Sequence, residues 1–229
     1  MPDCHALLPC AGVGARSGAP LPKQYVQIAG KAMVAHTLAA LARVPALAGI
    51  LVVLAPDDAL FEIAVPGFDG PHCRVARCGG ATRAETVANG LAVLAAQGAQ
   101  PHDWVLVHDA ARCLVRPQWV ERLIAACWSD PVGGLLALPL ADTLKQERAG
   151  RVAATLARDG KWAAQTPQMF RLGLLRDALA RADAAVTDEA GAVEALGHAP
   201  LLVRGELENF KLTHAGDFEL AQRLLRTPP

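Results

Sequence analysis

The chain has 229 residues, a length that suits one large α/β domain or two small ones. Hydrophobic residues make up 52% of it, enough to bury a sizeable core, and its 22 Lys and Arg residues balance 22 Asp and Glu residues. General electrostatic attraction to nucleic acid or to an anionic membrane needs a basic excess, so the composition argues against both partners. Any anion must then be bound by individually placed side chains.

The sequence predicts neither membrane insertion nor secretion. Its long apolar stretches, such as residues 46–55, are well short of the ~20 residues that cross a bilayer. The N-terminal segment 1–5 lacks the basic start of a signal peptide. The six cysteines are scattered without a C-x-x-C pair, which disfavours a zinc ribbon or a thioredoxin-type motif. We expect buried free thiols in a cytoplasmic protein.

Short apolar runs alternate along the chain with longer segments of helical periodicity. The runs are almost continuously hydrophobic, which is typical of parallel strands covered on both faces. The predicted strands are His5–Ala11, Gly49–Leu54, Cys73–Arg77, Trp104–His108, Gly133–Pro139 and Leu201–Val203.

The predicted helices lie between and after these strands. Thr82–Ala96 opens with T-R-A-E, the pattern of a capping box, and Pro117 suits the first turn of a helix over Arg116–Cys127. The remaining predicted helices are Lys31–Arg43, Leu172–Arg181, Asp188–Leu196 and Gly216–Leu225. The repeated strand–helix–strand order predicts a doubly wound, Rossmann-like α/β fold with a mostly parallel sheet.

The segment at about 141–165 interrupts this alternation. It is more polar, contains Gly150 and Gly160, and has β-like pieces around Arg151–Leu156. No internal repeat or low-complexity linker marks a second domain. We therefore interpret the chain as one domain over residues 1–229, with this segment as a β-arm that projects from the sheet.

The loop after the first strand combines glycines with two cations. Residues 11–18 read A-G-V-G-A-R-S-G, and Lys23 follows within P-K-Q-Y. Glycine lets backbone N–H groups approach an anion closely, and ligands of open α/β sheets bind at this end of the strands. The dinucleotide fingerprint fails because Ser17 stands at its third glycine, and the G-K-S/T ending of a P-loop is missing. Phosphate binding through Arg16 and Lys23 is favoured over an ordinary turn with solvated cations.

The whole pattern, G-x-G-x-R-x-G followed by P-K-Q-Y, resembles the nucleotide loop of the sugar-nucleotidyltransferase superfamily. Within it, P-K-Q-Y resembles the family of 2-C-methyl-D-erythritol 4-phosphate cytidylyltransferases of the non-mevalonate isoprenoid pathway. The resemblance implies a transfer of CMP from CTP to the phosphate of a sugar alcohol. It also implies that the first loop holds CTP through Cys10, Ala11, Gly12 and Gly14.

Residues 79–83, G-G-A-T-R, precede the capped helix. Two glycines beside a helix N-terminus can contact a base or a phosphate through the backbone, although a loop that needs flexible φ angles explains them nearly as well. The family has a similar motif that holds cytosine and ribose. By this resemblance Gly80, Ala81 and Thr86 line the base, with Ala81 standing where an acidic residue is common.

Residues 107–112, V-H-D-A-A-R, end the fourth predicted strand. An Asp that leaves the carboxyl end of a parallel strand faces the ligand crevice and suits Mg²⁺, whereas a helix cap or a salt bridge to Arg112 is the alternative. The motif is a signature of the family, which implies that Asp109 and Ala110 bind the nucleotide and that Asp109 positions the metal. Cys113 replaces a proline that is usual there.

The arm and the C-terminal part carry the expected acceptor site. The family resemblance implies that Thr143 and Arg158 reach across a homodimer to grip the substrate phosphate of the neighbouring subunit. Thr187 begins a helix as its cap and also matches a substrate-phosphate threonine. Lys211, in the N-x-K-x-T pattern of residues 209–213, would neutralise the reacting phosphates, and Glu208 is a weaker candidate for a metal contact.

The expected reaction is an in-line attack of the acceptor phosphate on the α-phosphorus of CTP. A phosphate is largely ionised near neutral pH, so no general base is required, and cations carry the catalysis. The expected catalytic residues are Arg16, Lys23, Arg158 and Lys211, with Mg²⁺ or another divalent cation as cofactor. A ribitol 5-phosphate cytidylyltransferase and a non-catalytic nucleotide-binding module remain as alternatives.

Overall fold

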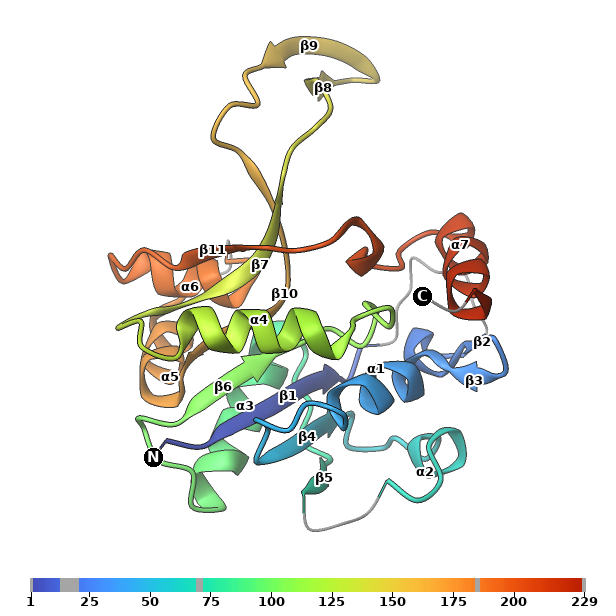
Figure 1. Cartoon of the computed structure of the whole chain (residues 1–229), viewed down its shortest axis with the longest axis vertical. Helices are drawn as coiled ribbons and strands as arrows, with labels where there is room; N and C mark the ends of the chain where they lie inside the picture. The colour runs from blue at the N-terminus through green and yellow to red at the C-terminus, as the bar shows by residue number, and fades with distance from the viewer. Residues whose placement is uncertain (1, 13–20, 69–71, 184–185, 228–229) are drawn as a thin grey trace.

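A seven-stranded sheet lies at the centre of the residues that the computed structural model describes, namely 2–12, 21–68, 72–183 and 186–227. Its strands stand in the order β11-β7-β10-β6-β1-β4-β5 (Figure 1). Their bounds are β1 (Cys4–Cys10), β4 (Gly49–Leu54), β5 (Cys73–Ala76), β6 (Trp104–Val107), β7 (Gly133–Pro139), β10 (Trp162–Arg171) and β11 (Leu201–Arg204).

The sheet is mostly parallel. β1 pairs in parallel with β4 and β6, β4 with β5, and β11 with β7. Only β10, among the strands of this sheet, runs antiparallel to both its neighbours, β6 and β7. All four residues of β6 are buried, as expected for a strand covered on both faces. The predicted fold class is confirmed.

β10 is the strand of the main sheet that was not predicted from the sequence. Its first half reads W-A-A-Q-T-P, in which a proline and two polar residues argue against a central strand. The structure accommodates them by a register shift between Ala164 and Gln168, where the chain leaves the regular pairing with β7. The predicted arm ended at Gln165, but Trp162–Ala164 already pair with β7 inside the main sheet.

Helices cover both faces of the sheet and bury the alternating side chains of its strands. Ala6 and Leu8 of β1 pack with the helices of one face, and Leu7 packs with those of the other. The first face is covered by α1 (Met33–Leu41) and α4 (Pro117–Cys127). The second face is covered by α3 (Arg83–Ala96), α5 (Leu172–Arg181) and α6 (Glu189–Ala195) (Figure 1).

Two helix starts follow the predicted chemistry and one does not. Thr82 and Glu85 form the predicted capping box of α3, and Pro117 occupies the first turn of α4. Thr187 was predicted to cap α6, which was wrong. The cap is Asp188, whose Oδ1 accepts a hydrogen bond from the N–H of Gly191 at 3.0 Å.

Smaller elements surround the first loop and the C-terminal part. Ile28 and Met33 share a small core with Leu212 and with Ala221 of the C-terminal helix. The bounds of these elements are η2 (Lys23–Tyr25), β2 (Gln27–Ile28), β3 (Lys31–Ala32), α2 (Phe61–Ala64), η3 (Leu207–Asn209) and α7 (Ala215–Arg226).

The arm is a two-stranded antiparallel hairpin of β8 (Leu144–Arg148) and β9 (Arg151–Leu156). Figure 1 shows it projecting from the main sheet at the ends of β7 and β10. Almost all of its side chains are exposed, Val152 by 65% and Leu156 by 42%. Among the described residues, no helix is long and apolar enough to span a membrane.

Candidate active site

A cavity of about 540 Å³ lies at the C-terminal ends of β1 and β6. Loops from four separate parts of the chain meet there, as expected for the ligand crevice of an open α/β sheet. The lining residues are Pro9, Cys10, Ala11, Gly12, Lys23, Gln24, Met33, Gly80, Ala81, Thr82, Arg83, Thr86, Asp109, Ala110, Ala111 and Lys211.

The P-K-Q-Y segment is fixed to the sheet by its polar side chains. Gln24 donates a hydrogen bond from Nε2 to the carbonyl of Cys10 at 2.9 Å. Tyr25 donates from its hydroxyl to Asp58 Oδ2 at 2.6 Å. These two anchors hold Lys23 at the wall of the cavity. The predicted residues Gly14 and Arg16 lie outside the described part of the chain.

Neighbouring atoms lie so close to the two glycines of the second loop that a side chain would not fit at either position. A Cβ atom at Gly79 would lie 2.2 Å from the Cβ of Ala11, and one at Gly80 would lie 2.4 Å from the Cβ of Glu85. Neither glycine has a positive φ angle. Their role is therefore to bring the second loop against the first loop and to let it fold over the start of α3.

The polar groups of the second loop are largely used within the loop. The N–H of Ala81 donates to Glu85 Oε2 at 2.7 Å as part of the cap. The hydroxyl of Thr86 accepts from the N–H of Gly80 at 3.1 Å and donates to the carbonyl of Thr82 at 2.9 Å. Gly80, Ala81 and Thr86 all line the cavity, and Thr86 also holds the loop in shape.

Asp109 lies at the centre of a cluster of charges. Its Oδ1 accepts from Arg83 Nε at 2.8 Å, and its Oδ2 is 2.7 Å from Lys211 Nζ. The predicted alternative, a salt bridge from Asp109 to Arg112, was wrong. Arg112 instead donates to the carbonyls of Asn209 at 2.7 Å and Ala164 at 3.3 Å.

Arg83 joins this carboxylate to a second, buried one. Its Nη1 and Nη2 donate to the two carboxylate oxygens of Glu189, at 2.6 and 3.0 Å. The Glu189 side chain is 1% exposed and that of Asp109 is 9% exposed. Burial raises the pKa of Asp109, but the charges of Arg83 and Lys211 outweigh it and hold that pKa below its ordinary value. Asp109 is therefore an anion across the physiological range.

A buried polar chain supports Asp109 from behind. The N–H of Asp109 donates to Thr166 Oγ1 at 3.0 Å, and that hydroxyl lies 3.1 Å from His108 Nδ1. His108 Nε2 lies 3.3 Å from the carbonyl of Arg112. A proton on Nε2 satisfies all three contacts, because Thr166 then donates to Nδ1. Burial lowers the pKa of His108 to about 4, so the ring is neutral at pH 7.

The segment that carries Lys211 is tied to β10. Asn209 Nδ2 donates to the carbonyl of Thr166 at 2.8 Å and to Gln165 Oε1 at 3.2 Å. Gln165 Nε2 in turn donates to the carbonyl of Glu206 at 2.9 Å. The irregular part of β10 thus positions both the Asp109 backbone and the loop that delivers Lys211.

Three predicted acceptor residues do not line this cavity. Thr143 and Arg158 flank the arm hairpin and are exposed. Arg158 Nη1 donates to the carbonyl of Ala141 at the base of the arm. Thr187 lines a neighbouring cavity of about 410 Å³, which Arg83 and Glu189 also line. Arg83 is therefore a shared wall between the two cavities.

The described residues offer no ready-made metal cage. No group of three or more His, Cys, Asp or Glu side chains is arranged there to hold a metal ion. Glu208, the weaker metal candidate, pairs with Arg116 and does not line the cavity. Asp109 is the one carboxylate among the residues that line it.

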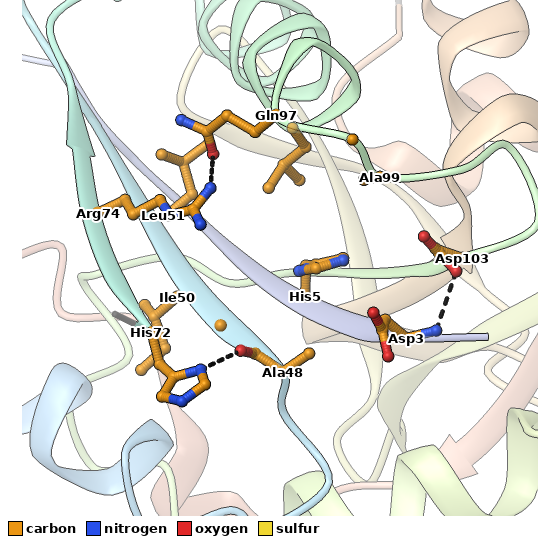
Figure 2. A pocket seen from close by; sticks show the side chains of 13 residues that line it. Asp3, His5, Ala48, Ile50, Leu51, His72, Arg74, Gln97, Ala99 and Asp103 are labelled. Carbon is orange, nitrogen blue, oxygen red and sulfur yellow. Dashed lines mark hydrogen bonds between the residues drawn. The ribbon is translucent and has the colours of Figure 1, made fainter. Parts of the chain in front are cut away.

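A different cavity, of about 420 Å³, lies at the amino ends of β1, β4 and β5. Figure 2 shows its polar side chains joined mostly to one another or to the backbone. Arg74 Nη1 donates to Gln97 Oε1 at 2.6 Å, and His72 Nδ1 lies 2.8 Å from the carbonyl of Ala48. The Asp103 carboxylate accepts from the N–H of Asp3 at 2.9 Å. None of the predicted site residues lies here.

Several residues of the site were not predicted from the sequence. Arg83 stood inside the G-G-A-T-R motif but received no role, and Glu189 was interpreted only as part of a helix start. Thr166 and Gln165 were placed at the closing end of the arm. Their contacts join segments up to 106 residues apart, so no local pattern signals them.

The comparisons with known proteins agree with this geometry. Residues 4–227 match the family described as IspD, 2-C-methyl-D-erythritol 4-phosphate cytidylyltransferase. The chain belongs to this family.

The relatives cover the chain almost completely. A bifunctional enzyme IspD/IspF of Albidiferax ferrireducens is 61% identical over 99% of this chain, which spans 54% of that protein. A 2-C-methyl-D-erythritol 4-phosphate cytidylyltransferase of Paraburkholderia phytofirmans is 54% identical over 97% of this chain and 96% of its own length. This chain thus spans about half the length of the bifunctional relative and nearly all of the single-function one.

A solved structure supports the same assignment. The crystal structure of a 4-diphosphocytidyl-2C-methyl-D-erythritol synthase superposes with a TM-score of 0.87 at 43% identity, covering 98% of this chain and 99% of that chain. The family predicted from P-K-Q-Y and V-H-D-A-A-R is confirmed.

Proposed function

We propose that this chain transfers CMP from CTP to 2-C-methyl-D-erythritol 4-phosphate and releases pyrophosphate. The observation that carries the proposal is the convergence of Lys23, Lys211 and Asp109 on one glycine-walled cavity. A nucleoside triphosphate is a polyanion, and because the chain has no general basic excess, individually placed cations must bind it. A non-catalytic nucleotide-binding module could lose Lys23, Asp109 or Lys211, and all three are present.

The chemistry follows from the charges that meet. An acceptor phosphate oxygen attacks the α-phosphorus of CTP, a P–O bond forms, and the bond to the β-phosphate oxygen breaks. Pyrophosphate leaves with that electron pair. The nucleophile is already ionised near neutral pH, so the chain's task is to bring two polyanions together.

Each cation has a proposed place in this task. Lys23 and Arg16 bind the triphosphate and the charge that builds on the leaving group, with Gly14 beside them in the first loop. Lys211 neutralises the attacking phosphate after it leaves Asp109 and pairs with that phosphate. The neutral His108 and Thr166 act only by holding the Asp109 backbone.

A divalent cation, Mg²⁺, fits the donor set in one respect. Mg²⁺ in nucleotide enzymes is often held by one or two carboxylates together with substrate phosphates, so Asp109 suffices as the protein ligand. Lys211 Nζ already contacts Asp109 Oδ2 at 2.7 Å, which marks that oxygen as a cation-binding position. When bound, Mg²⁺ would withdraw charge from the phosphate oxygens.

We further propose that the arm completes the site of a second subunit in a homodimer. Thr143 and Arg158 are exposed and do not line their own cavity, and apolar Val152, Leu156 and Trp162 are exposed on and beside the arm. A partner that covers these side chains would also receive the phosphate grip of Thr143 and Arg158. Under this proposal residues 1–229 form one nucleotidyltransferase domain with a dimerisation arm at about 141–165.

The proposed location is the cytoplasm. All six cysteines are free, and four of them are buried. Burial raises the pKa of the Cys4 thiol to about 12, so it remains an unreactive thiol in a reducing compartment.

The decisive experiment supplies CTP and Mg²⁺ with either 2-C-methyl-D-erythritol 4-phosphate or ribitol 5-phosphate and measures pyrophosphate. Release with the first acceptor alone is expected. Release with ribitol 5-phosphate alone would assign the chain to that acceptor instead. No release with either, while CTP still binds, would favour a non-catalytic module.

A further inference from the structure

The Arg83 guanidinium is shared unequally between two buried carboxylates. It gives Nε to Asp109 and both Nη groups to Glu189. The Glu189 pair is the two-pronged geometry in which Arg binds carboxylates most strongly. Glu189 therefore determines the direction in which the guanidinium fork points.

Glu189 itself does not line the cavity that holds Lys23 and Asp109. It is the first residue of α6 and its side chain is 1% exposed. Burial raises the pKa of Glu189 and the charge of Arg83 opposes that rise. Arg83 is the one cation that contacts Glu189 among the described residues, and it links Glu189 to Asp109 at the cavity.

The two oxygens of Asp109 have different partners because of this arrangement. Oδ1 is used by Arg83 Nε, and Oδ2 remains for Lys211 at the cavity. If Glu189 released the guanidinium, Arg83 could turn one edge with two N–H donors to both oxygens of Asp109 and bind it in the same two-pronged way. Lys211 would then lose its partner.

We propose that Glu189 is a positioning residue that holds the Arg83 fork away from Asp109 and so keeps Oδ2 of Asp109 available at the cavity. The four groups form a balanced set of two carboxylates and two cations. Glu189 keeps these four groups in the arrangement in which Oδ2 of Asp109 can exchange Lys211 for a bound ligand.

The direct test measures Lys211 rather than catalysis. An amine-acylating reagent is applied to the full chain, and the labelling rate of Lys211 is divided by that of the exposed Lys31 by peptide mass spectrometry. Lys211 is 42% exposed and accessible to the reagent. In Glu189→Gln this ratio should rise roughly tenfold, the change that corresponds to about 1.4 kcal/mol of lost pairing.

A double variant separates positioning from general loosening. In R83M/E189Q no fork remains to capture Asp109, so the Lys211 ratio should return to the wild-type value. A ratio that stays high in the double variant would show that Glu189 merely stabilises the fold, and an unchanged ratio in E189Q would also overturn the proposal. Glu194→Gln, on the exposed side of the same helix, is the matched control and should change nothing.

Glu189→Asp keeps the charge but shortens the side chain. Its Lys211 ratio should lie between those of wild type and E189Q. If E189Q does not fold, E189D carries the test, and a ratio equal to wild type would contradict the proposal.

Kinetics provide the second measurement and rest on the proposed cytidylyl transfer. E189Q should lower kcat roughly 10- to 100-fold, the range expected for a misplaced reacting group, with little change in the KM for CTP. Adding E189Q to R83M should cause no further loss of kcat, because both substitutions act through the same Arg83–Glu189 pair. A wild-type protein without activity would refute the proposed function but leave the labelling result intact.

Discussion

The two ends of the same sheet carry different chemistry. At the amino ends of β1, β4 and β5, Arg74, Gln97, His72 and Asp103 have partners within the cavity wall, and no lysine faces the space (Figure 2). At the carboxyl ends, Lys23 and Lys211 face the cavity and Asp109 shares its oxygens with two cations. Both cavities are of similar size. The candidate active site therefore differs from the other cavity in its charged side chains, which can exchange their ion-pair partners for a ligand. Its volume does not distinguish it.

The largest effect should come from removing a cation at the carboxyl end. Lys23→Ala should lower kcat about 100-fold or more, as for other groups that stabilise developing charge. Lys31→Ala, an exposed lysine outside this cavity, is the matched control in the pyrophosphate assay. Weaker CTP binding with an unchanged kcat would mean that Lys23 binds substrate without stabilising the transition state.

The next effect concerns stability in acid. The folded pKa of His108 is about 4 against an ordinary value of 6.5, so the unfolded chain takes up a proton first as the pH falls below 6.5. Because of this group, the free energy of unfolding should fall by about 2 kcal/mol between pH 7 and pH 5, and it should fall further towards pH 4. Urea unfolding between pH 7 and pH 5 measures the change.

His108→Gln should remove most of this pH dependence, whereas replacement of the exposed His198 by Gln should leave it unchanged. His5, at the amino end, also has a pKa lowered by burial and should account for part of the remaining slope. An identical slope in His108→Gln and wild type would place the acid sensitivity elsewhere.

A third effect tests whether the carboxyl-end site is shared between subunits. Arg158→Ala should raise the KM for the acceptor roughly tenfold, since it removes one charged contact to a phosphate. At an acceptor concentration well below KM, where both variants are impaired, mixed Lys23→Ala and Arg158→Ala chains should regain about a quarter of wild-type activity, because half of the dimers are hybrids and each hybrid has one intact site. No recovery in hybrids that have demonstrably formed would exclude a contribution across the interface.

The smallest effect is expected at the amino end. Arg74→Gln removes a hydrogen bond to Gln97 on the surface and should change kcat less than about twofold, with a stability change within about 0.5 kcal/mol. A large loss of activity would show that the amino-end cavity takes part in the reaction.

The local parts of this structure could be predicted from the sequence. Continuous apolar runs marked β1, β4 and β6, and T-R-A-E marked the start of α3, because each signal lies within one element. The motif residues Lys23, Gly80, Asp109 and Lys211 were predicted and lie around one cavity. The positions of Gly14 and Arg16 in that site remain predictions.

The missed parts depend on tertiary contacts. β10 contains Gln165, Thr166 and Pro167, which disfavour a strand locally, yet these residues make the irregular pairing that supports Asp109. Glu189 follows the helix cap in sequence and gains its partner only when α3 and α6 pack on the same face of the sheet. Such pairings are set by the fold, and no spacing in the sequence specifies them.

The central claim is that the acceptor phosphate attacks the α-phosphorus of CTP at the carboxyl-end cavity. The most direct measurement uses 2-C-methyl-D-erythritol 4-phosphate labelled with ¹⁸O in its phosphate and follows the label by ³¹P NMR. The account predicts that all of the label stays in the newly formed diphosphate diester and that pyrophosphate carries none. Label in pyrophosphate, or formation of CMP without a diphosphate diester, would contradict it.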